Sequence, residues 1–333
     1  SVVLLVGAIR VNKGVTQPGV ILAFLTYFQM ILMGVMILNR FFLLMSKANA
    51  SSDRIKAVIE KSDGLVRAPE EACRKAPNDD YIIFDDVSFS YGEAETEDKA
   101  SFAGEERKKT LDHISFSIKK GGSLGIIGGT GSGKTTIINL LMRFYDTDEG
   151  AVFVDGKDVR SYSLDSLRKR FGVVFQNDVI FADTISGNII FGRDVDEDAL
   201  EKASQDALAF SFIHGYNDGF EHLAAIRGAN FSGGQKQRLL IARALVSSPD
   251  ILVLDDSSSA LDYKTDAELR KNIRLHHQNA TTIVVAQRIS SIMSLDHILV
   301  LHEGKVIGYG THEELLASSK EYQEIYETQM GEV

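Results

Sequence analysis

The chain has 333 residues, of which 44% are hydrophobic and 25% charged, and its formal net charge is −10. This length exceeds that of a typical single domain, so more than one folded unit is expected. The acidic balance argues against a general nucleic-acid-binding protein, which carries a basic face, and the single cysteine, Cys73, excludes an internal disulfide framework and a cysteine-based zinc site.

The N-terminal part contains a run long enough to cross a membrane. Val20–Leu38 comprises 19 residues without a charge. As a helix rising ~1.5 Å per residue it would span ~28 Å, close to the ~30 Å hydrocarbon core of a bilayer. A helix buried in a soluble protein is the alternative, but such a helix normally shows a polar face over this length. The composition therefore favours a transmembrane helix.

The segments on either side of this run indicate its orientation. Ser1–Ile9 is apolar but too short to span, and it lacks the basic segment and cleavage site of a secretory signal. Because the chain starts with Ser inside an apolar run, we expect it to be a fragment whose upstream membrane helices are missing. Basic residues are more numerous on the C-terminal flank of the long run, at Arg40, Lys47, Arg54 and Lys56, than on the N-terminal flank, at Arg10 and Lys13. This bias predicts that the rest of the chain is cytoplasmic.

A linker and a soluble domain are expected after the membrane part. The helical pattern continues to Glu60, and residues 61–78 hold two prolines, a glycine and several charges, as linkers do. We place the membrane part at residues 1–62, the linker at 63–80 and the soluble domain at 81–333.

The soluble domain alternates strand and helix patterns. From Tyr81 onward apolar and polar residues alternate, which indicates a strand. A helix is expected from Lys134, and residues 183–230 are expected to be mainly helical. Residues 92–109 are acidic and poor in large apolar side chains, which predicts an exposed loop insertion. Further strands are expected at Leu111–Ile118, Ser123–Ile127, Ala151–Val154, Gly172–Gln176, Ile251–Asp255, Thr281–Val285 and Ile298–Leu301. This alternation predicts an α/β sheet domain.

A glycine-rich loop joins one of these strands to the helix at Lys134. Gly128, Gly133, Lys134 and Thr135 satisfy the spacing G-x(4)-G-K-T, which in this context is typical of a phosphate-binding loop. The lysine can neutralise phosphate oxygens, the helix N-terminus adds partial positive charge, and the threonine hydroxyl can ligate Mg²⁺. A purely structural turn would not require Lys-Thr at the start of a helix. We therefore expect ATP and Mg²⁺ to bind at these residues: Gly128, Gly129, Thr130, Gly131, Ser132, Gly133, Lys134, Thr135 and Thr136.

Four further segments follow in a fixed order. They are Phe231-Ser232-Gly233-Gly234-Gln235, Ile251–Asp255, Ser259-Ala260-Leu261-Asp262 and Ala286-Gln287-Arg288. With the phosphate loop, they make the chain from about Tyr81 to its end resemble the nucleotide-binding domain of an exporter-type ABC transporter. Upstream, Ser1–Ile9 and Val20–Glu60 resemble the last two transmembrane helices of a six-helix exporter half. The resemblance implies an α/β P-loop NTPase domain, with a helical subdomain at about residues 177–232, preceded by transmembrane α-helices.

The resemblance also implies roles for single residues. Tyr91 matches the aromatic residue that stacks on adenine, although an aromatic side chain packed into the core is an alternative. Gln176 matches the glutamine that reaches Mg²⁺ and senses the membrane domain, and Asp255 matches the acid that holds Mg²⁺ through water. Since ATP lies between two domains in this family, the signature Phe231–Gln235 should contact nucleotide on a partner chain. For Ser232 a simple helix N-cap is the alternative, and the two roles are compatible.

Two positions depart from the family pattern. Asp256 stands where a glutamate normally orients or activates the attacking water, and Gln287 stands where a histidine normally contacts the γ-phosphate. A displacement of ~1 Å at a reacting centre can cost ~10²-fold in rate, and loss of a stabilising donor ~10²–10³-fold. The two losses need not multiply. Both fall in the site built on this chain's own phosphate loop, which resembles the degenerate site of a heterodimeric exporter.

The function that we expect is an ATP-binding subunit of an ABC exporter in the plasma membrane, most simply a bacterial inner membrane. Its partners would be a second half-transporter, membrane lipid and an exported small molecule, lipid or peptide, with no nucleic acid. The alternative is a regulatory nucleotide-binding subunit that gates a partner transporter without its own turnover. A homodimer with two weakened sites is disfavoured, as is a soluble ATPase without transport, since Val20–Leu38 argues against it.

Overall fold

A computed structural model of the chain describes residues 2–60, 65–92, 109–257 and 260–331. It divides into two compact units, Ser1–Leu65 and Val66–Val333. Most of the predicted loop insertion, residues 93–108, and Ser259 of the predicted Ser259–Asp262 segment lie outside the described residues.

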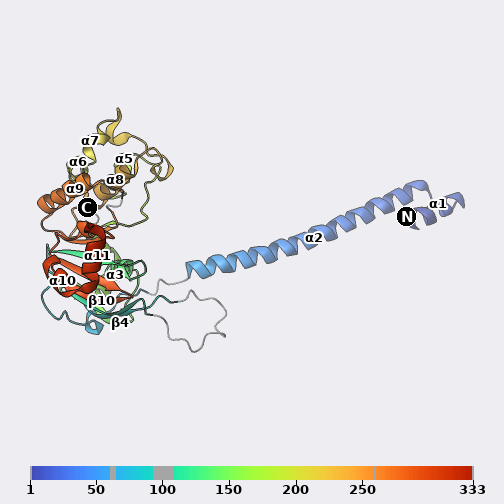
Figure 1. Ribbon diagram of the computed structural model, residues 1–333. Coiled ribbons are helices and arrows are strands. Elements are labelled where there is room, and N and C mark those ends of the chain that lie inside the picture. Colours follow the sequence, from blue (N-terminus) through green and yellow to red (C-terminus); the bar gives the residue numbers. More distant parts are fainter. Residues whose placement is uncertain (1, 61–64, 93–108, 258–259, 332–333) are drawn as a thin grey trace. The chain divides into compact units, whose positions relative to one another are not determined.

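The first unit consists of two helices, α1 (Val2–Asn12) and α2 (Pro18–Ile59) (Figure 1). Pro18 starts α2, where its missing N–H costs no hydrogen bond. The two helices approach closely at Gly7, since a Cβ there would lie 2.7 Å from the Cδ1 of Ile21. Small residues allow such close packing of membrane helices. The expected helix around Val20–Leu38 is thus part of one 42-residue helix, and α1 extends past the apolar run Ser1–Ile9 to Asn12.

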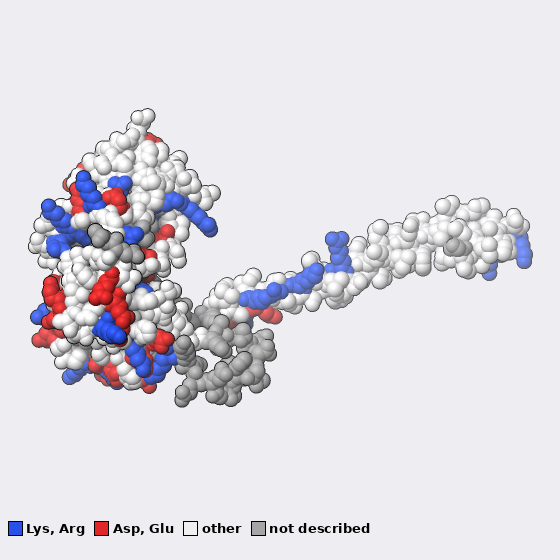
Figure 2. Space-filling model, viewed as in Figure 1, with Lys and Arg blue, Asp and Glu red and all other residues white. Residues whose placement is uncertain are grey.

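The surface of α2 changes character along its length. An 18-residue window has a mean hydropathy of 2.2 with none of its residues buried, so the helix is long and apolar enough to cross a membrane. Figure 2 shows its N-terminal part without charged side chains and its C-terminal part bearing lysines and arginines. Among the described residues, none of α2 is buried, and a bilayer supplies the apolar environment that such a helix requires.

The second unit contains two sheets. The antiparallel sheet has the order β2-β1-β4-β5: β2 (Leu111–Ile118), β1 (Ile82–Phe89), β4 (Glu149–Val154) and β5 (Lys157–Asp158). The other has the order β10-β9-β3-β8-β7-β6: β10 (Lys305–Gly310), β9 (His297–His302), β3 (Ser123–Gly128), β8 (Thr281–Val285), β7 (Ile251–Asp255) and β6 (Phe171–Val174). All neighbours in the second sheet pair in parallel except β10, which pairs antiparallel with β9. The predicted α/β class is confirmed, whereas the division of the strands into two sheets was not predicted.

Helices surround the parallel sheet and form a subdomain at one end. The α-helices are α3 (Lys134–Leu141), α4 (Leu164–Arg168), α5 (Ile185–Ile190), α6 (Glu197–Asp206), α7 (Phe210–Ile213), α8 (Gly233–Leu245), α9 (Tyr263–His276), α10 (His312–Ser318) and α11 (Lys320–Met330). Short 3₁₀ helices are η1 (Glu70–Ala72), η2 (Val159–Ser161), η3 (Gly219–Glu221), η4 (Ile226–Gly228) and η5 (Ile289–Ser291). Figure 1 shows α5, α6 and α7 gathered at the end of the unit away from β4 and β10.

Two hydrophobic clusters hold the second unit together. One joins the antiparallel sheet to α3 and the parallel sheet, and its cross-strand pair Phe84 and Phe116 stacks with ring centroids 4.6 Å apart. The other joins α5, α6 and α8 to the parallel sheet. Buried Arg243 of α8 reinforces that cluster by donating to the backbone oxygen of Asn188 in α5, at 2.8 Å. The parallel strands therefore present their carboxyl ends at a fixed edge, where α/β proteins place their ligand sites.

Candidate nucleotide-binding site

The phosphate loop begins where the backbone of β3 closely approaches β9. Gly128 pairs with Leu301, and a Cβ at Gly128 would lie 2.2 Å from the carbonyl oxygen of Leu301. At the other end of the loop, Gly133 has φ 100°, and a Cβ there would lie 2.5 Å from the Leu111 side chain. Neither position accommodates a larger residue without movement of the backbone or of Leu111. These two glycines fix the turn from β3 into α3.

Donors converge inside this turn. Lys134 Nζ donates to the carbonyl oxygens of Gly128 and Gly129, both at 2.8 Å. Burial lowers the pKa of Lys134, while Asp255 and Asp256 act in the opposite direction. The N-cap Gly133 offers no side-chain acceptor to the first turn of α3, and the buried Oγ of Ser132 has no hydrogen-bond partner among the described residues. Free amide donors at a helix N-terminus, a lysine ammonium and an unpaired hydroxyl fit a phosphate group.

A pocket of about 330 Å³ lies beside this loop. It contains most of the residues predicted to bind ATP and Mg²⁺, together with Thr110 and Val285, for which no such role was predicted. The lining residues are Tyr91, Thr110, Thr130, Gly131, Gly133, Lys134, Thr135, Thr136, Gln176, Asp255, Asp256, Val285, Ala286 and Gln287. Gly128, Gly129 and Ser132 belong to the same loop without lining the pocket.

Oxygen ligands suitable for Mg²⁺ meet in this pocket. Asp255 ends β7, is buried and lines the pocket together with Thr135. Burial raises the pKa of Asp255, the nearby Asp256 raises it further, and Lys134 and the Thr135 side chain oppose these effects. Gln176 lies two residues beyond the end of β6 and faces the same pocket. A buried carboxylate, a hydroxyl and an amide oxygen form a donor set that fits a hard divalent cation.

The two residues that depart from the family pattern contact each other. Gln287 Nε2 donates to Asp256 Oδ2 at 2.9 Å. Asp256 directly follows β7 and has φ 50°, so its side chain leaves the strand from a left-handed turn. Its backbone N–H donates to the carbonyl oxygen of Val285 at 2.9 Å, which keeps it beside the end of β8. The site therefore pairs a short carboxylate with a neutral amide.

The segment that carries Gln287 is anchored by two helices that the sequence analysis did not connect with the site. Gln329 of α11 donates to the carbonyl oxygen of Gln287 and accepts from the N–H of Ile289, each at 2.8 Å. Arg270 of α9 donates to the carbonyl oxygen of Ser290 at 3.2 Å. An amide side chain that both donates and accepts holds the backbone much as a neighbouring strand would. No local motif marks Gln329, so only the three-dimensional contact reveals it.

Tyr91 lies at the pocket instead of inside the core. Its ring is 42% exposed and packs edge-on against Phe89 and Tyr145. Its hydroxyl group is 3.1 Å from Thr136 Oγ1 and accepts a hydrogen bond from Asn139 Nδ2 at 3.2 Å. The core-packing alternative for Tyr91 is therefore wrong, whereas its contact with adenine stays a prediction.

The predicted signature starts α8. Ser232 caps the helix in a reciprocal arrangement, since its Oγ accepts from the N–H of Gln235 and its own N–H donates to Gln235 Oε1. Ser232 and Gly233 are exposed, while Phe231 is buried near Phe212, Tyr216 and His222. The N-cap role of Ser232 is thus present, and the helix end remains open to solvent. The signature does not line the pocket of its own chain.

The segment before α9 packs beside the signature. A Cβ on Gly234 would lie 3.5 Å from the carbonyl oxygen of Ala260 and 3.7 Å from the side chain of Leu261. Asp262 caps α9 by accepting from the N–H of Thr265 at 2.9 Å. The described part of the predicted Ser259–Asp262 segment therefore adjoins Gly234 within the same chain.

Comparison with known proteins places these features in a family. Residues 111–259 match the family model for ABC transporters. The chain is 37% identical over 328 residues to the ATP-dependent lipid A-core flippase of Desulfotalea psychrophila, covering 98% of this chain and 55% of that protein. It is 36% identical over 327 residues to the probable multidrug resistance ABC transporter ATP-binding/permease protein YheI of Bacillus subtilis. That alignment covers 97% of this chain and 53% of YheI.

A solved structure agrees with these relatives. The structure of a bacterial Atm1-family ABC exporter with ATP bound aligns with a TM-score of 0.73 and 33% identity, covering 84% of this chain and 46% of that one. The chain spans about half the length of the curated relatives it matches.

The close approach at Gly128 gives a first test. Gly128→Ala should abolish measurable ATP binding, because the added methyl group meets backbone that cannot move without shifting β9. Gly156→Ala is the matched control, since Gly156 has φ 73°, open space around its Cβ position and no place in the pocket lining. It should cost only about 1–2 kcal/mol of stability and retain binding. Titration with a fluorescent ATP analogue measures the difference, and equal binding by both variants would contradict the packing argument.

The contact from α11 gives a second test. Gln329→Ala removes both hydrogen bonds to the Gln287 segment, so amide exchange at residues 286–290 should accelerate by about tenfold. Gln323→Ala on the same helix is the control, because Gln323 binds the carbonyl oxygen of Leu316 instead. Hydrogen–deuterium exchange of both variants measures the effect. An unchanged rate in Gln329→Ala would show that α11 does not hold this segment.

Proposed function

This chain belongs to the ABC transporter family, and on that premise we propose that it is the ATP-binding subunit of an exporter that couples ATP binding and hydrolysis at a dimer interface to transport across a membrane. The length and apolar surface of α2 support a place in the membrane. The basic residues after its apolar part support a cytoplasmic position for the second unit. A bacterial plasma membrane is the simplest location, since the exporters described above come from bacteria.

The pocket supports ATP as the ligand and Mg²⁺ as its counter-ion. Lys134 and the amides at the start of α3 would hold the phosphates, and Tyr91 would contact the adenine ring. Thr135 and Gln176 would hold Mg²⁺ directly, and Asp255 would hold it through water. The cation neutralises charge on the β- and γ-phosphate oxygens when bound. The residues of this chain would thus hold the phosphates, the cation and the adenine ring, and the signature of a partner chain would complete the site.

We infer that this site turns ATP over slowly, and the hydrogen bond from Gln287 to Asp256 carries the inference. An aspartate carboxylate lies closer to its backbone than a glutamate carboxylate, so it cannot reach as far toward an attacking water. The carboxylate is also engaged by an amide, which can donate a hydrogen bond but cannot carry a positive charge at the γ-phosphate. Both differences weaken stabilisation of the transition state and leave the binding groups in place.

A second half-transporter of different sequence would supply the competent site. Ser232 and Gly233 stand exposed at the capped end of α8, available to a nucleotide held by another chain. A subunit that only regulates its partner would not need this intact, exposed signature, so the exporter reading is favoured. In a heterodimer, this chain would complete the partner's site and hold ATP in its own. The exported substrate would be a small molecule, lipid or peptide.

ATP hydrolysis by the assembled pair tests whether the partner's site performs most of the turnover. When the partner's glutamate next to its Mg²⁺-binding aspartate is replaced by glutamine, ATP hydrolysis should fall to below about 1% of the original rate, since the remaining site lacks two stabilising groups. Phosphate release at saturating ATP measures it, with the unmodified pair as the reference. Substantial residual turnover would contradict a degenerate site.

Restoring the family residues tests the same site in the opposite direction. In a pair whose partner site is inactivated, Asp256→Glu with Gln287→His should raise turnover at least about tenfold. The gains in turnover of the two single variants should together be smaller than the gain of the double variant, because the two groups act on one transition state. ATP affinity should stay within about twofold, because the phosphate loop is unchanged. A double variant no faster than the starting pair would mean that other residues limit hydrolysis.

A further inference from the structure

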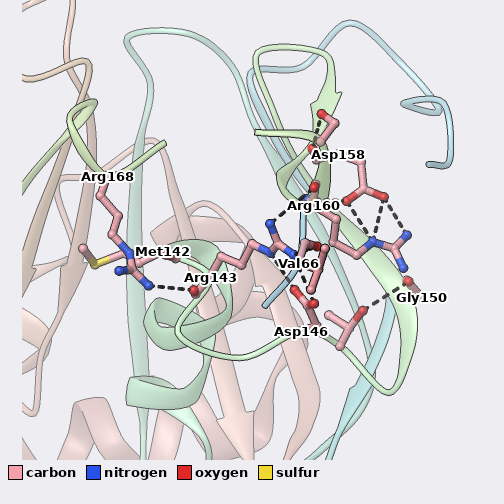
Figure 3. Close-up of polar contacts among 10 residues, drawn as sticks. Val66, Met142, Arg143, Asp146, Gly150, Asp158, Arg160 and Arg168 are labelled. Atoms are coloured by element: carbon pink, nitrogen blue, oxygen red, sulfur yellow. Dashed lines mark hydrogen bonds and ion pairs between the residues drawn. The ribbon is translucent and has the colours of Figure 1, made fainter. Parts of the chain in front are cut away.

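Arg143 is a buried arginine just beyond the end of α3. Its side chain is 1% exposed. Its Nε donates to Asp146 Oδ1 at 2.7 Å, and its Nη2 donates to Asp146 Oδ2 at 3.2 Å and to the carbonyl oxygen of Val66 at 2.9 Å. Its Nη1 reaches the carbonyl oxygen of Arg160 at 3.3 Å. Figure 3 shows the guanidinium group between Asp146, Arg160 and Val66. A fixed planar fork thus holds one carboxylate and two backbone carbonyls at once.

Val66 is where the chain enters the second unit after α2. Ala68 N–H donates to the carbonyl oxygen of Arg160 at 2.9 Å, and Arg67 Nε donates to the carbonyl oxygen of Ser161 at 2.7 Å. The segment 66–68 is therefore bound along η2 by two contacts besides the one from Arg143. We call this segment the entry segment. In the sequence, residues 60–65 separate the entry segment from the end of α2.

Helix α3 connects Arg143 with the phosphate loop. Lys134 is the first residue of α3 and Arg143 lies two residues after its last, Leu141. A helix of this length extends only about 12 Å. Arg168 fixes the end of α3 by donating to the carbonyl oxygens of Met142 and Arg143, at 3.3 and 3.0 Å. Thus α3 has the nucleotide pocket at its start and the entry segment at its end.

We propose that Arg143 is a positioning residue that ties the entry segment to α3, so that a displacement of the chain leaving α2 is delivered to the phosphate loop. The proposal rests on the proposed function, because a moving membrane part gives this tie its purpose. A charge-assisted bond to a backbone carbonyl in a buried site resists being pulled apart, since rupture leaves donor and acceptor unpaired. Closely packed helices move as bodies, so α3 passes displacement along its axis.

The test uses the full chain assembled with its partner and two matched variants. Arg143→Gln removes the donor to the entry segment, whereas Arg168→Gln removes an arginine that grips the same end of α3 without touching that segment. Amide exchange of residues 66–72 is measured with and without ATP. In the Arg143→Gln variant, the amide exchange rate of residues 66–72 should rise about tenfold and should no longer change when ATP is added. In Arg168→Gln it should stay near the original rate.

Coupling is measured on the same samples as the ratio of substrate-stimulated to basal ATP hydrolysis. This ratio should fall about fivefold or more in Arg143→Gln, while the affinity for a fluorescent ATP analogue stays within about twofold. A merely structural role would lower ATP affinity and both hydrolysis rates together. If Arg143→Gln does not fold, Arg143→Lys takes its place. Lysine keeps a positive charge near Asp146 but cannot also donate to the carbonyl oxygens of Val66 and Arg160.

Each outcome decides the proposal. Unchanged exchange at residues 66–72 in the Arg143 variant, or an equal rise in Arg168→Gln, would overturn it. A stimulated ratio that survives loss of Arg143 would also overturn it. If the unmodified pair transports nothing, the proposed function is contradicted instead. The exchange measurement would still show whether the ATP response of the entry segment depends on Arg143.

Discussion

The backbone of Gly128 lies against the carbonyl group of Leu301, and the geometry of the nucleotide pocket depends on this approach. Because no side chain intervenes, β3 can turn directly into α3 beside β9. The turn places the uncapped start of α3 and Lys134 at the edge where the parallel strands end. The same edge carries Asp255 and the residues that follow β6 and β8. One close backbone contact thus brings together groups that are far apart in the sequence.

Binding and hydrolysis depend on different parts of this pocket. The loop and α3 supply attraction for phosphate through backbone amides and one ammonium group, and these are complete in this chain. Hydrolysis also needs groups that act on the attacking water and on charge developing at the γ-phosphate. Here those positions hold Asp256 and Gln287, which hydrogen-bond to each other. These features support our proposal that the pocket holds ATP and turns it over slowly.

The sequence predicted the elements better than their contacts. β7 and β8 begin and end where expected, because a continuous run of buried apolar residues has clear limits. The antiparallel sheet was not recognised as separate, since strand pattern alone does not say which strands pair. The contacts of Gln329 with Gln287 and of Arg143 with Val66 join residues 42 and 77 positions apart. Such contacts follow from packing, which a single sequence leaves unspecified.

We propose that this chain holds ATP while its partner hydrolyses it, and trapping with vanadate distinguishes the two chains. Vanadate retains ADP only at a site that has completed a turnover, and a photoreactive azido-ATP then labels the chain that holds it. We expect the vanadate-trapped label on the partner chain, with this chain labelled only by exchangeable ATP. Equal vanadate-dependent trapping on both chains would contradict it.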